Sequence, residues 1–495
     1  MQQEKAEAYL LEMVSLLQSQ GEAVISSQLE IIVRELSVRH YHEASAVLLQ
    51  LLLTELTQTA ADTDRYNFIR AHAFEIHQNL ILSIRADISP IVYVKMVDLI
   101  AFAQLHAAGA GAFDDATYQK ALGLVESAQR SLSGQGSLQG RHAAQCIHAH
   151  LLLEHTMHDE AAVFAALRAH QPAAASTPQL TFQEAVRLLS AVPGSPPHQA
   201  RKLLEDTEQF ANSLQLHDVE AVLLYLLSKA RGKDYELRRQ YTLYYQNSFD
   251  MLNCMKKAEM QLTAVERQQL AYKTILCAFL SDSIFNFGKF MQCEELHDAL
   301  QAAAARHAAA PNMGWAMQWV QQCSEGEVDA FEAYFAQHRA VIEEAIVSFA
   351  FGGGARTELQ AQQCEEIFAS IFKKVRLMAL LHLIFYTPIH KCVFTFQQIA
   401  ERCRIRESDE VELLLLTAMA QGIVRGSMDG LTQTVTLSWV EPRLLGHREV
   451  RELGGAYAQL AHAHRGRARA GARSHLRGPC TAAGPDLNMH TRITK

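Results

Sequence analysis

Apolar residues recur at helical spacing from near the start of the chain. Two groups share one helix face each: Leu29, Ile32, Val33 and Leu36 before a break at His40, and Ala44, Val47, Leu48 and Leu51 after it. Two helices joined by so short a turn form an antiparallel pair, the repeating unit of an α-solenoid. Two more helices are predicted over 67–105. A division is expected at Ser89–Pro90, because proline disfavours helical geometry in the residue before it.

Glycine and proline interrupt the helical pattern in the middle of the chain. Loops are predicted over 106–115 and over the Gly- and Ser-rich run 131–140. Between 171 and 198, prolines recur at 172, 178, 193, 196 and 197. We therefore expect a weakly structured insertion there around one helix, Phe182–Ser190. From His198 to Ala350 the helical pattern is nearly continuous.

A different succession of elements begins at Phe368. One helix face is marked by Phe368, Ile371, Phe372, Val375 and Ala379. The β-prone run 393–396 follows. Within it Thr395 stands three residues before Gln398, which is the spacing of a capping box, so a helix is predicted over Phe396–Cys403.

The last predicted elements are a helix and a β-hairpin. Ser408 is the expected N-cap and Gly422 the expected C-cap of the helix between them. The runs 423–426 and 434–439, with a turn at Asp429–Gly430, predict the hairpin. The order helix, strand, helix, helix, strand, strand is that of a winged helix.

The charges of the helix 408–422 argue against DNA reading. It contains Asp409, Glu410 and Glu412 and no Lys or Arg. Duplex binding depends on cations that neutralise phosphates, so this helix would repel the groove. The pattern favours contacts with proteins instead, with the outer strand of the hairpin offered to a partner's sheet edge.

Several stretches carry a family resemblance. They are 394–400 (FTFQQIA), 409–414 (DEVELL), 422–428 (GIVRGSM) and 439–443 (WVEPR), with weaker likeness at 284–288 and 331–338. Residues 383–445 resemble the end of a PCI domain, a scaffold of helical repeats and a winged helix found in the proteasome lid, the signalosome and a translation initiation factor. Within this class the chain is similar to the 26S proteasome non-ATPase regulatory subunit 13 family.

With the resemblance, the fold class is all-α: an α-solenoid followed by the winged helix of a PCI domain, then a flexible C-terminal tail. The predicted domains are N-terminal helical repeats 1–170, a Pro-rich linker 171–198, the helical part of the PCI domain 199–363, its winged helix 364–445 and the tail 446–495. The tail is rich in Arg, Ala and Gly, and no acidic residue lies between Glu452 and Asp486. The family ends in a longer helix that joins a bundle, and this tail lacks the apolar stripe for it.

Composition limits the alternatives. The 495 residues are 49% hydrophobic and 20% charged, as in a soluble globular protein, and the net charge of −8 gives no attraction to nucleic acid or anionic membranes. No secretory signal or transmembrane helix is predicted. The 9 cysteines form no C-x-x-C, so they are expected to be thiols in a reducing compartment, cytoplasm or nucleus.

Histidines provide the strongest candidate for metal chemistry. The cluster consists of His148, His150, His155, His158 and Asp159. On a helix His148 and His150 point about 200° apart, and only His155 and His158 have converging spacing, whereas a catalytic zinc site usually needs three protein ligands. We expect a solvated helix here, without a metal or another cofactor. A histidine-dependent metallohydrolase is the alternative.

As the resemblance implies, the expected function is a non-catalytic scaffold subunit of the proteasome regulatory particle lid, in a hetero-oligomer with other PCI subunits. No catalytic residue is expected. The residues expected at partner contacts lie on the hairpin: Ile423, Val424, Val435, Leu437 and Trp439. The alternatives are a PCI scaffold of the signalosome or of an initiation factor, and a nucleic-acid-binding winged helix.

Overall fold

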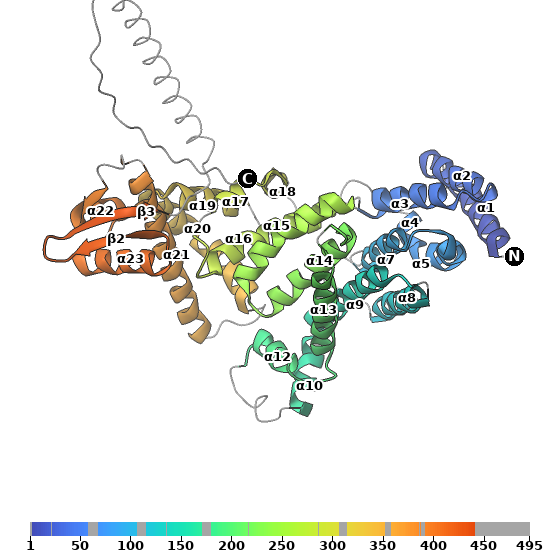
Figure 1. The fold of residues 1–495 in the computed structure, drawn as a ribbon, viewed down its shortest axis with the longest axis horizontal. Coiled ribbons are helices and arrows are strands. Elements are labelled where there is room, and N and C mark those ends of the chain that lie inside the picture. The colour runs from blue at the N-terminus through green and yellow to red at the C-terminus, as the bar shows by residue number, and fades with distance from the viewer. Residues whose placement is uncertain are drawn as a thin grey trace, which may run out of the picture. The chain divides into compact units, whose positions relative to one another are not determined.

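The structure is a computed structural model. It describes residues 2–440 apart from 21, 58–67, 106–114, 135, 171–179, 216, 286, 306–313, 352–357, 386 and 388–391. The described residues belong to one compact unit, Met1–Glu441, and a second unit, Pro442–Lys495, lies outside them. The predicted tail 446–495 therefore falls outside the described residues. Figure 1 shows the ribbon.

The chain begins with three helices that pack in sequence: α1 (Gln2–Gln20), α2 (Ala23–Ser37) and α3 (Tyr41–Thr57). Leu29, Ile32 and Leu36 of α2 are buried, as are Ala44, Leu48 and Leu51 of α3. The turn between α2 and α3 passes through Arg39, whose φ is +63°. The antiparallel pair predicted from the hydrophobic pattern is thus confirmed.

The next segment is irregular before it becomes a regular helix. Its elements are α4 (Phe68–Ala71), α5 (Ala73–Ile76), the π-helical η2 (His77–Ile81), α6 (Leu82–Ile84), the 3-10 turn η3 (Arg85–Asp87) and α7 (Pro90–Leu105). The predicted division at Ser89–Pro90 is confirmed. Pro90 starts α7, where its missing N–H has no helical partner to lose.

The pair α8 (Asp115–Gly134) and α9 (Leu138–His158) corrects one prediction. The loop expected over 131–140 is wrong, because α8 continues through the buried Ser131 and Leu132. Only a short turn remains, and the Ser137 Oγ caps α9 by accepting a hydrogen bond from the Gly140 N–H at 3.3 Å. Burial of Ser131 and Leu132 outweighs the turn-like composition of this segment.

The proline-rich stretch contains helices as well. After α10 (Glu160–His170), α12 (Phe182–Leu189) carries a capping box of Thr181 and Glu184, in agreement with the helix predicted there. Pro196 opens α13 (Pro196–Ser213), which packs on α9. The linker limits 171–198 stay a prediction.

The helical stack then continues to the winged helix, and each helix packs on neighbours close in sequence. Its elements are α14 (Ala221–Leu237), α15 (Tyr241–Ala258), α16 (Ala264–Leu280), α17 (Gly288–Met291), α18 (Glu294–Ala305), α19 (Gly314–Glu325), α20 (Val328–Phe351) and α21 (Glu358–Phe385). Between α19 and α20, Gly326 has a φ of +65°, and a Cβ there would lie 2.7 Å from the backbone nitrogen of Ala379 in α21. Only glycine lets this turn approach α21 so closely.

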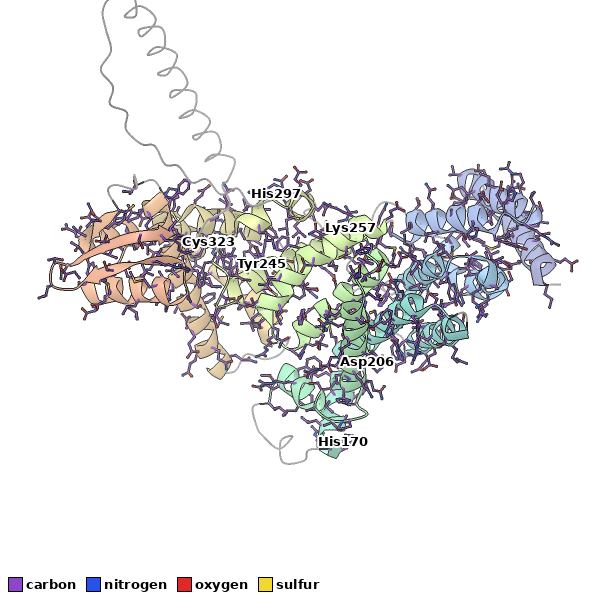
Figure 2. The ribbon with its side chains drawn as sticks, viewed as in Figure 1. His170, Asp206, Tyr245, Lys257, His297 and Cys323 are labelled. Carbon is purple, nitrogen blue, oxygen red and sulfur yellow. The ribbon has the colours of Figure 1, made fainter. Side chains whose placement is uncertain are left out.

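Aromatic rings fill the core where α19, α20 and α21 meet. Trp319 is fully buried and stacks on Phe331 with ring centroids 5.7 Å apart, and Phe335 packs edge-on against Phe368 at 4.9 Å. Cys323, labelled in Figure 2, is buried one turn after Trp319. These aromatics are core residues.

The winged helix closes the described part of the chain. It consists of β1 (Val393–Thr395), α22 (Phe396–Cys403), α23 (Ser408–Ala420), β2 (Val424–Asp429) and β3 (Thr434–Val440), and its antiparallel sheet has the order β1-β3-β2. The predicted fold class, a helical solenoid followed by a winged helix, is confirmed. Within the described residues, no helix combines the length and apolar character needed to cross a membrane.

Candidate functional site

Local sequence signals set the first helix of the winged helix. The Thr395 Oγ1 accepts a hydrogen bond from the Gln398 N–H at 3.2 Å, and the Gln398 Oε1 accepts one from the Thr395 N–H at 3.1 Å. The predicted capping box is therefore present, and it fixes the start of α22 directly after β1.

The second helix, α23, differs from its prediction at one end. Ser408 is its first helical residue, and the N-cap position belongs to Glu407, whose side chain makes no capping bond. The predicted Ser408 cap is wrong. At the other end Gly422 has a φ of +73°, as expected of the glycine that ends a helix. The sequence predicts one buried stripe on this helix; Val411, Leu414, Leu415 and Ala418 are buried as expected, and Met419 is half-buried.

The hairpin of β2 and β3 places most of the predicted contact residues inside the domain. Ile423, Val424, Val435 and Leu437 are buried, with at most 6% of each residue exposed, and they pack in the core. Their side chains face the interior because each strand must cover the helices with one of its faces. These four side chains are part of the core, and Trp439 is the only exposed residue among the five predicted contact residues.

A β-bulge accounts for the exposure of Trp439. Arg425 pairs with Trp439 but the next residue, Gly426, pairs with Leu437, so Ser438 is the extra residue of β3. The Ser438 Oγ donates a hydrogen bond to the Arg425 carbonyl oxygen at 3.1 Å. The bulge reverses the alternation of side chains and turns Trp439 to the outer face, where the Arg425 guanidinium lies 4.8 Å from the centre of its ring.

The strand order decides which backbone a partner can reach. β3 lies between β1 and β2, so β2 forms one edge of the sheet within the described residues. Its backbone groups on that side are available for an added strand. Of the two edge strands, β1 and β2, the longer β2 is the candidate for strand addition, with Arg425 and Trp439 on the adjoining outer face.

The charges of α23 remain unsuited to nucleic acid. Asp409 and Glu412 are exposed, and Glu410 pairs with Arg376 of α21 at 3.8 Å. Arg404, in the preceding turn, is paired with Asp329. The phosphates of a nucleic acid would face carboxylates along this helix and would be repelled by them.

The predicted histidine cluster does not converge. All four histidines lie on α9. His148 is 3.3 Å from the Gln129 amide, His150 is buried with its ring 4.4 Å from that of Phe102, and His155 stacks on Tyr118 at 4.3 Å. The aromatic packing explains these rings as parts of the interface between α9 and its neighbours. The expectation of a solvated helix is wrong for His150, which is buried.

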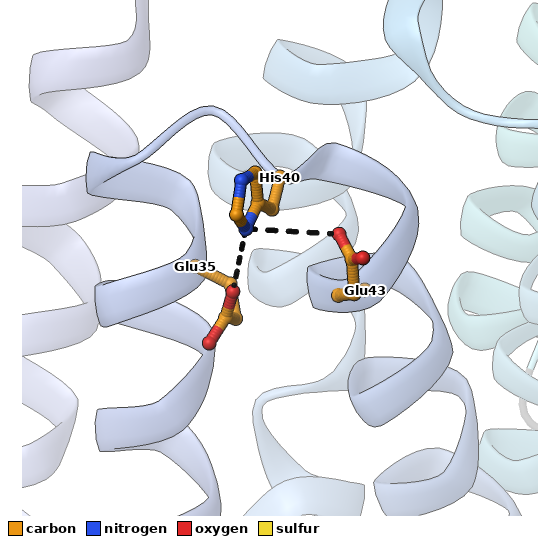
Figure 3. A group of neighbouring side chains, drawn as sticks. All are labelled: Glu35, His40 and Glu43. Atoms are coloured by element: carbon orange, nitrogen blue, oxygen red, sulfur yellow. Dashed lines mark hydrogen bonds and ion pairs between the residues drawn. The ribbon is translucent and has the colours of Figure 1, made fainter.

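Another group of potential ligands lies at the turn between α2 and α3. Across the described ranges, Glu35, His40 and Glu43 are the one trio of His, Cys or carboxylate ligand atoms within 4.8 Å of one another. Figure 3 shows the His40 Nδ1 between the two carboxylates, 3.1 Å from Glu35 and 3.9 Å from Glu43. Arg34 also binds Glu35, and hydrogen bonds from Arg34 and His40 hold the pKa of that carboxyl below its usual range. Ion pairing across a tight turn accounts for the group.

Sequence patterns did not reveal a charged cavity inside the helical stack. A cavity of about 110 Å³ lies among α9, α14, α15 and α16. Three lysines line it, and each is paired with a carboxylate: Lys229 with Asp98 at 3.2 Å, Lys233 with Glu154 at 3.0 Å and Lys273 with Glu236 at 2.6 Å. Burial opposes the charge of Lys229, but Asp98 overcomes it and holds the pKa of the ammonium above its usual value. The pairs tie α14 to α7, α9 and α16.

Four buried cysteines of the described residues are unsuited to act as nucleophiles. Cys146, Cys277, Cys323 and Cys403 are buried, and burial raises the pKa of each thiol, to about 12 for Cys146 and Cys403. The cysteines of the described ranges are free thiols. A thiol whose pKa is raised is a poor nucleophile at neutral pH.

Comparison with known proteins finds family models that match two regions of the chain. Residues 165–308 match the PSD13 N-terminal repeats, and residues 338–439 match the PCI domain. The first match runs from α10 to α18, and the second runs from α20 to β3. The chain therefore contains one region similar to the PSD13 N-terminal repeats and a later region similar to the PCI domain.

Several curated relatives share this similarity. The chain is 25% identical over 257 residues to the 26S proteasome regulatory subunit RPN9 of Saccharomyces cerevisiae, a match that covers 51% of this chain and 56% of the relative. It is 26% identical over 252 residues to the probable rpn9 subunit of Schizosaccharomyces pombe, covering 51% and 57%. It is 22% identical over 256 residues to the non-ATPase regulatory subunit 13 homolog B of Arabidopsis thaliana, covering 52% and 58%.

These matches confirm the resemblance read from the sequence. The chain is similar to the 26S proteasome non-ATPase regulatory subunit 13 family, RPN9 in yeast. It spans about half the length of the curated relatives that it matches.

Proposed function

We propose that this chain is a non-catalytic scaffold subunit of the lid of the 26S proteasome regulatory particle, acting in degradation of ubiquitinated proteins. The observation that carries the proposal is the presence in one chain of PSD13 N-terminal repeats followed by a PCI domain. Relatives with this similarity are named as proteasome regulatory subunits in fungi, a plant and an amoeba.

The proposed mechanism is the presentation of surfaces. The edge of β2 would receive a strand of a neighbouring PCI subunit, and Arg425 and Trp439 would contact the same neighbour from the outer face. Ile423, Val424, Val435 and Leu437 would act indirectly, because they hold β2 and β3 in place from the core. The partners would be other lid subunits in a hetero-oligomer, in the cytoplasm and nucleus.

Two other functions have less support. A PCI scaffold in the signalosome or an initiation factor would share the winged helix, but the match of residues 165–308 is to repeats named for subunit 13. A nucleic-acid-binding winged helix would need cations on α23, where the chain has Asp409, Glu410 and Glu412.

Depletion of the chain from its native cells tests the function. We expect native gels to show less intact 26S proteasome and blots to show accumulated ubiquitinated proteins, both restored when the chain is expressed again. Unchanged amounts of 26S proteasome after full depletion would contradict the proposal.

Hydrogen exchange tests the proposed contact. Backbone amides on the free side of β2 should exchange several-fold more slowly in the purified assembly than in the isolated chain, because a partner strand would accept their hydrogen bonds. The amides of α22, which are bonded within the helix in both states, serve as the internal control. Equal exchange of β2 in the two samples would rule out strand addition at this edge.

A further inference from the structure

The outward side of α23 carries exposed leucines beside carboxylates. Leu413 is 60% exposed and Leu416 is 49% exposed, although α23 buries a complete stripe on its other side. Ala420 is exposed as well. At about 100° per residue, Asp409, Glu412, Leu413, Leu416 and Ala420 fall within an arc of about 100°. We call these five residues the α23 outer face.

The α23 outer face is at once apolar and acidic. Asp409 and Glu412 flank the leucines, and no Lys or Arg occurs between Ser408 and Ala420. The Arg376 side chain pairs with Glu410, which lies outside this arc, toward α21. Exposed aliphatic side chains at i and i+3 on one line of a helix are typical of a surface that another helix covers.

Charge decides among the possible occupants of the α23 outer face. Duplex nucleic acid and anionic membrane surfaces would be repelled by Asp409 and Glu412. A second copy of this chain docked by the same face would oppose carboxylates to carboxylates, since a two-fold contact sets each patch against itself. A helix with an apolar stripe flanked by Lys or Arg satisfies both the leucines and the acids.

We propose that the α23 outer face docks a basic amphipathic helix of another protein subunit. The inference rests on the proposed function, because it takes the partner to be a subunit of the same assembly. It adds a second surface, on a helix, to the β2 edge. The winged helix would then hold one neighbour by strand addition and a helix of basic character by α23.

Site-specific photo-crosslinking tests the inference in the full chain. A photoreactive amino acid replaces Leu416 and, in a control chain, Leu431, which is 98% exposed at the tip of the hairpin. Each chain is purified within the regulatory assembly from its native cells and irradiated. The crosslinked peptides are then sequenced. We expect position 416 to crosslink, at least about fivefold more than position 431, to a helical segment with Lys or Arg beside its apolar residues.

The outcomes separate this inference from the proposed function. If the chain is in the assembly but position 416 crosslinks to nothing, to a second copy, or to a segment without basic residues, the inference fails and the function stands. If the chain is absent from the assembly, the proposed function fails first and the inference fails with it.

Charge reversal provides the second test. Glu412→Lys should lower the 416 crosslink about fivefold or more, and changing the nearest Lys or Arg of the crosslinked helix to Glu should restore it. Glu401→Lys, on the exposed side of α22, is the matched control and should leave the crosslink unchanged. Because both glutamates are exposed, thermal unfolding should be the same for both variants. A crosslink insensitive to Glu412→Lys would overturn the assignment of a basic partner.

Discussion

At the scale of the single residue, Lys374 connects α21 to the end of α16 within the helical stack. Its side chain extends from α21, is 2% exposed, and its Nζ donates hydrogen bonds to the carbonyl oxygens of Ala278 at 2.9 Å, Phe279 at 2.8 Å and Ser281. Those carbonyls end α16, whose last turn has no helical donors for them. Burial lowers the pKa of Lys374 to about 8, so the ammonium is charged at neutral pH.

Replacement of Lys374 should therefore be costly. Lys374→Met keeps the aliphatic stem but leaves three buried carbonyl groups without their donor, and we expect the free energy of unfolding to fall by about 2–4 kcal/mol in urea titrations. Lys373→Met, at the exposed neighbouring position, is the control and should change stability by less than about 0.5 kcal/mol. Equal stability of the two variants would show that Lys374 does not hold the end of α16.

His77 makes stability depend on pH. It is 3% exposed, its Nε2 lies 3.3 Å from the Tyr93 hydroxyl, and burial, with a smaller effect of Arg85, lowers its pKa from 6.5 to about 4. Between pH 6.5 and 4 the unfolded chain binds a proton that the folded chain does not. The free energy of unfolding should therefore decrease as the pH is lowered from 6.5 to 4, by about 3 kcal/mol in total from this group.

Denaturation at pH 7 and pH 5 checks the contribution of His77. His77→Gln should lose less stability than the wild type between these two pH values, because the buried titrating group is gone. His217→Gln, which replaces an exposed histidine, should keep the wild-type difference. The same pH response in all three chains would refute the assignment to His77.

Contacts between residues close in sequence could be predicted from the sequence, whereas contacts between residues distant in sequence could not. The Thr395–Gln398 capping box was predictable because its two residues are three apart and bond each other. The carbonyl partners of Lys374 lie 93–96 residues away, so no spacing rule exposes them. A period-2 pattern puts Trp439 on the same face as Val435 and Leu437, but one extra residue, Ser438, reverses that pattern and turns Trp439 to the other face.

At the scale of the element, turn geometry positions α20 against α21. Gly326→Ala should destabilise the protein by more than about 2 kcal/mol, because the residue has a φ of +65° and its new Cβ would lie 2.7 Å from a backbone nitrogen of α21. Gly123→Ala, inside α8 with nothing within 4 Å of the new Cβ, should instead stabilise by about 0.5–1 kcal/mol. Thermal unfolding of both variants measures the contrast, and a neutral Gly326→Ala would contradict the close approach.

Elements with strong periodicity were predictable, and those decided by packing were not. The α2–α3 pair and the β2–β3 hairpin follow from helical and alternating patterns. The end of α8 did not follow, since Ser131 and Gly134 have loop-like composition yet α8 continues through them. Tertiary burial overrode local propensity at that point.

At the scale of the whole molecule, the described residues form a stack of helices followed by a winged helix. The stack packs mainly neighbour on neighbour, and three partly buried ion pairs join α14 to α7, α9 and α16. Such a stack offers extended surfaces, here the β2 edge and the α23 outer face. We propose that these surfaces belong to a proteasome lid subunit.

The most direct measurement is purification of the tagged full chain from its native cells, with its partners quantified by mass spectrometry. The account predicts lid and ATPase-ring subunits of the proteasome in fixed proportion to the chain. If signalosome or initiation-factor subunits were recovered instead, the fold assignment would stand but the chain would be a scaffold of that other assembly. Recovery of the chain alone, as a monomer, would contradict the scaffold assignment.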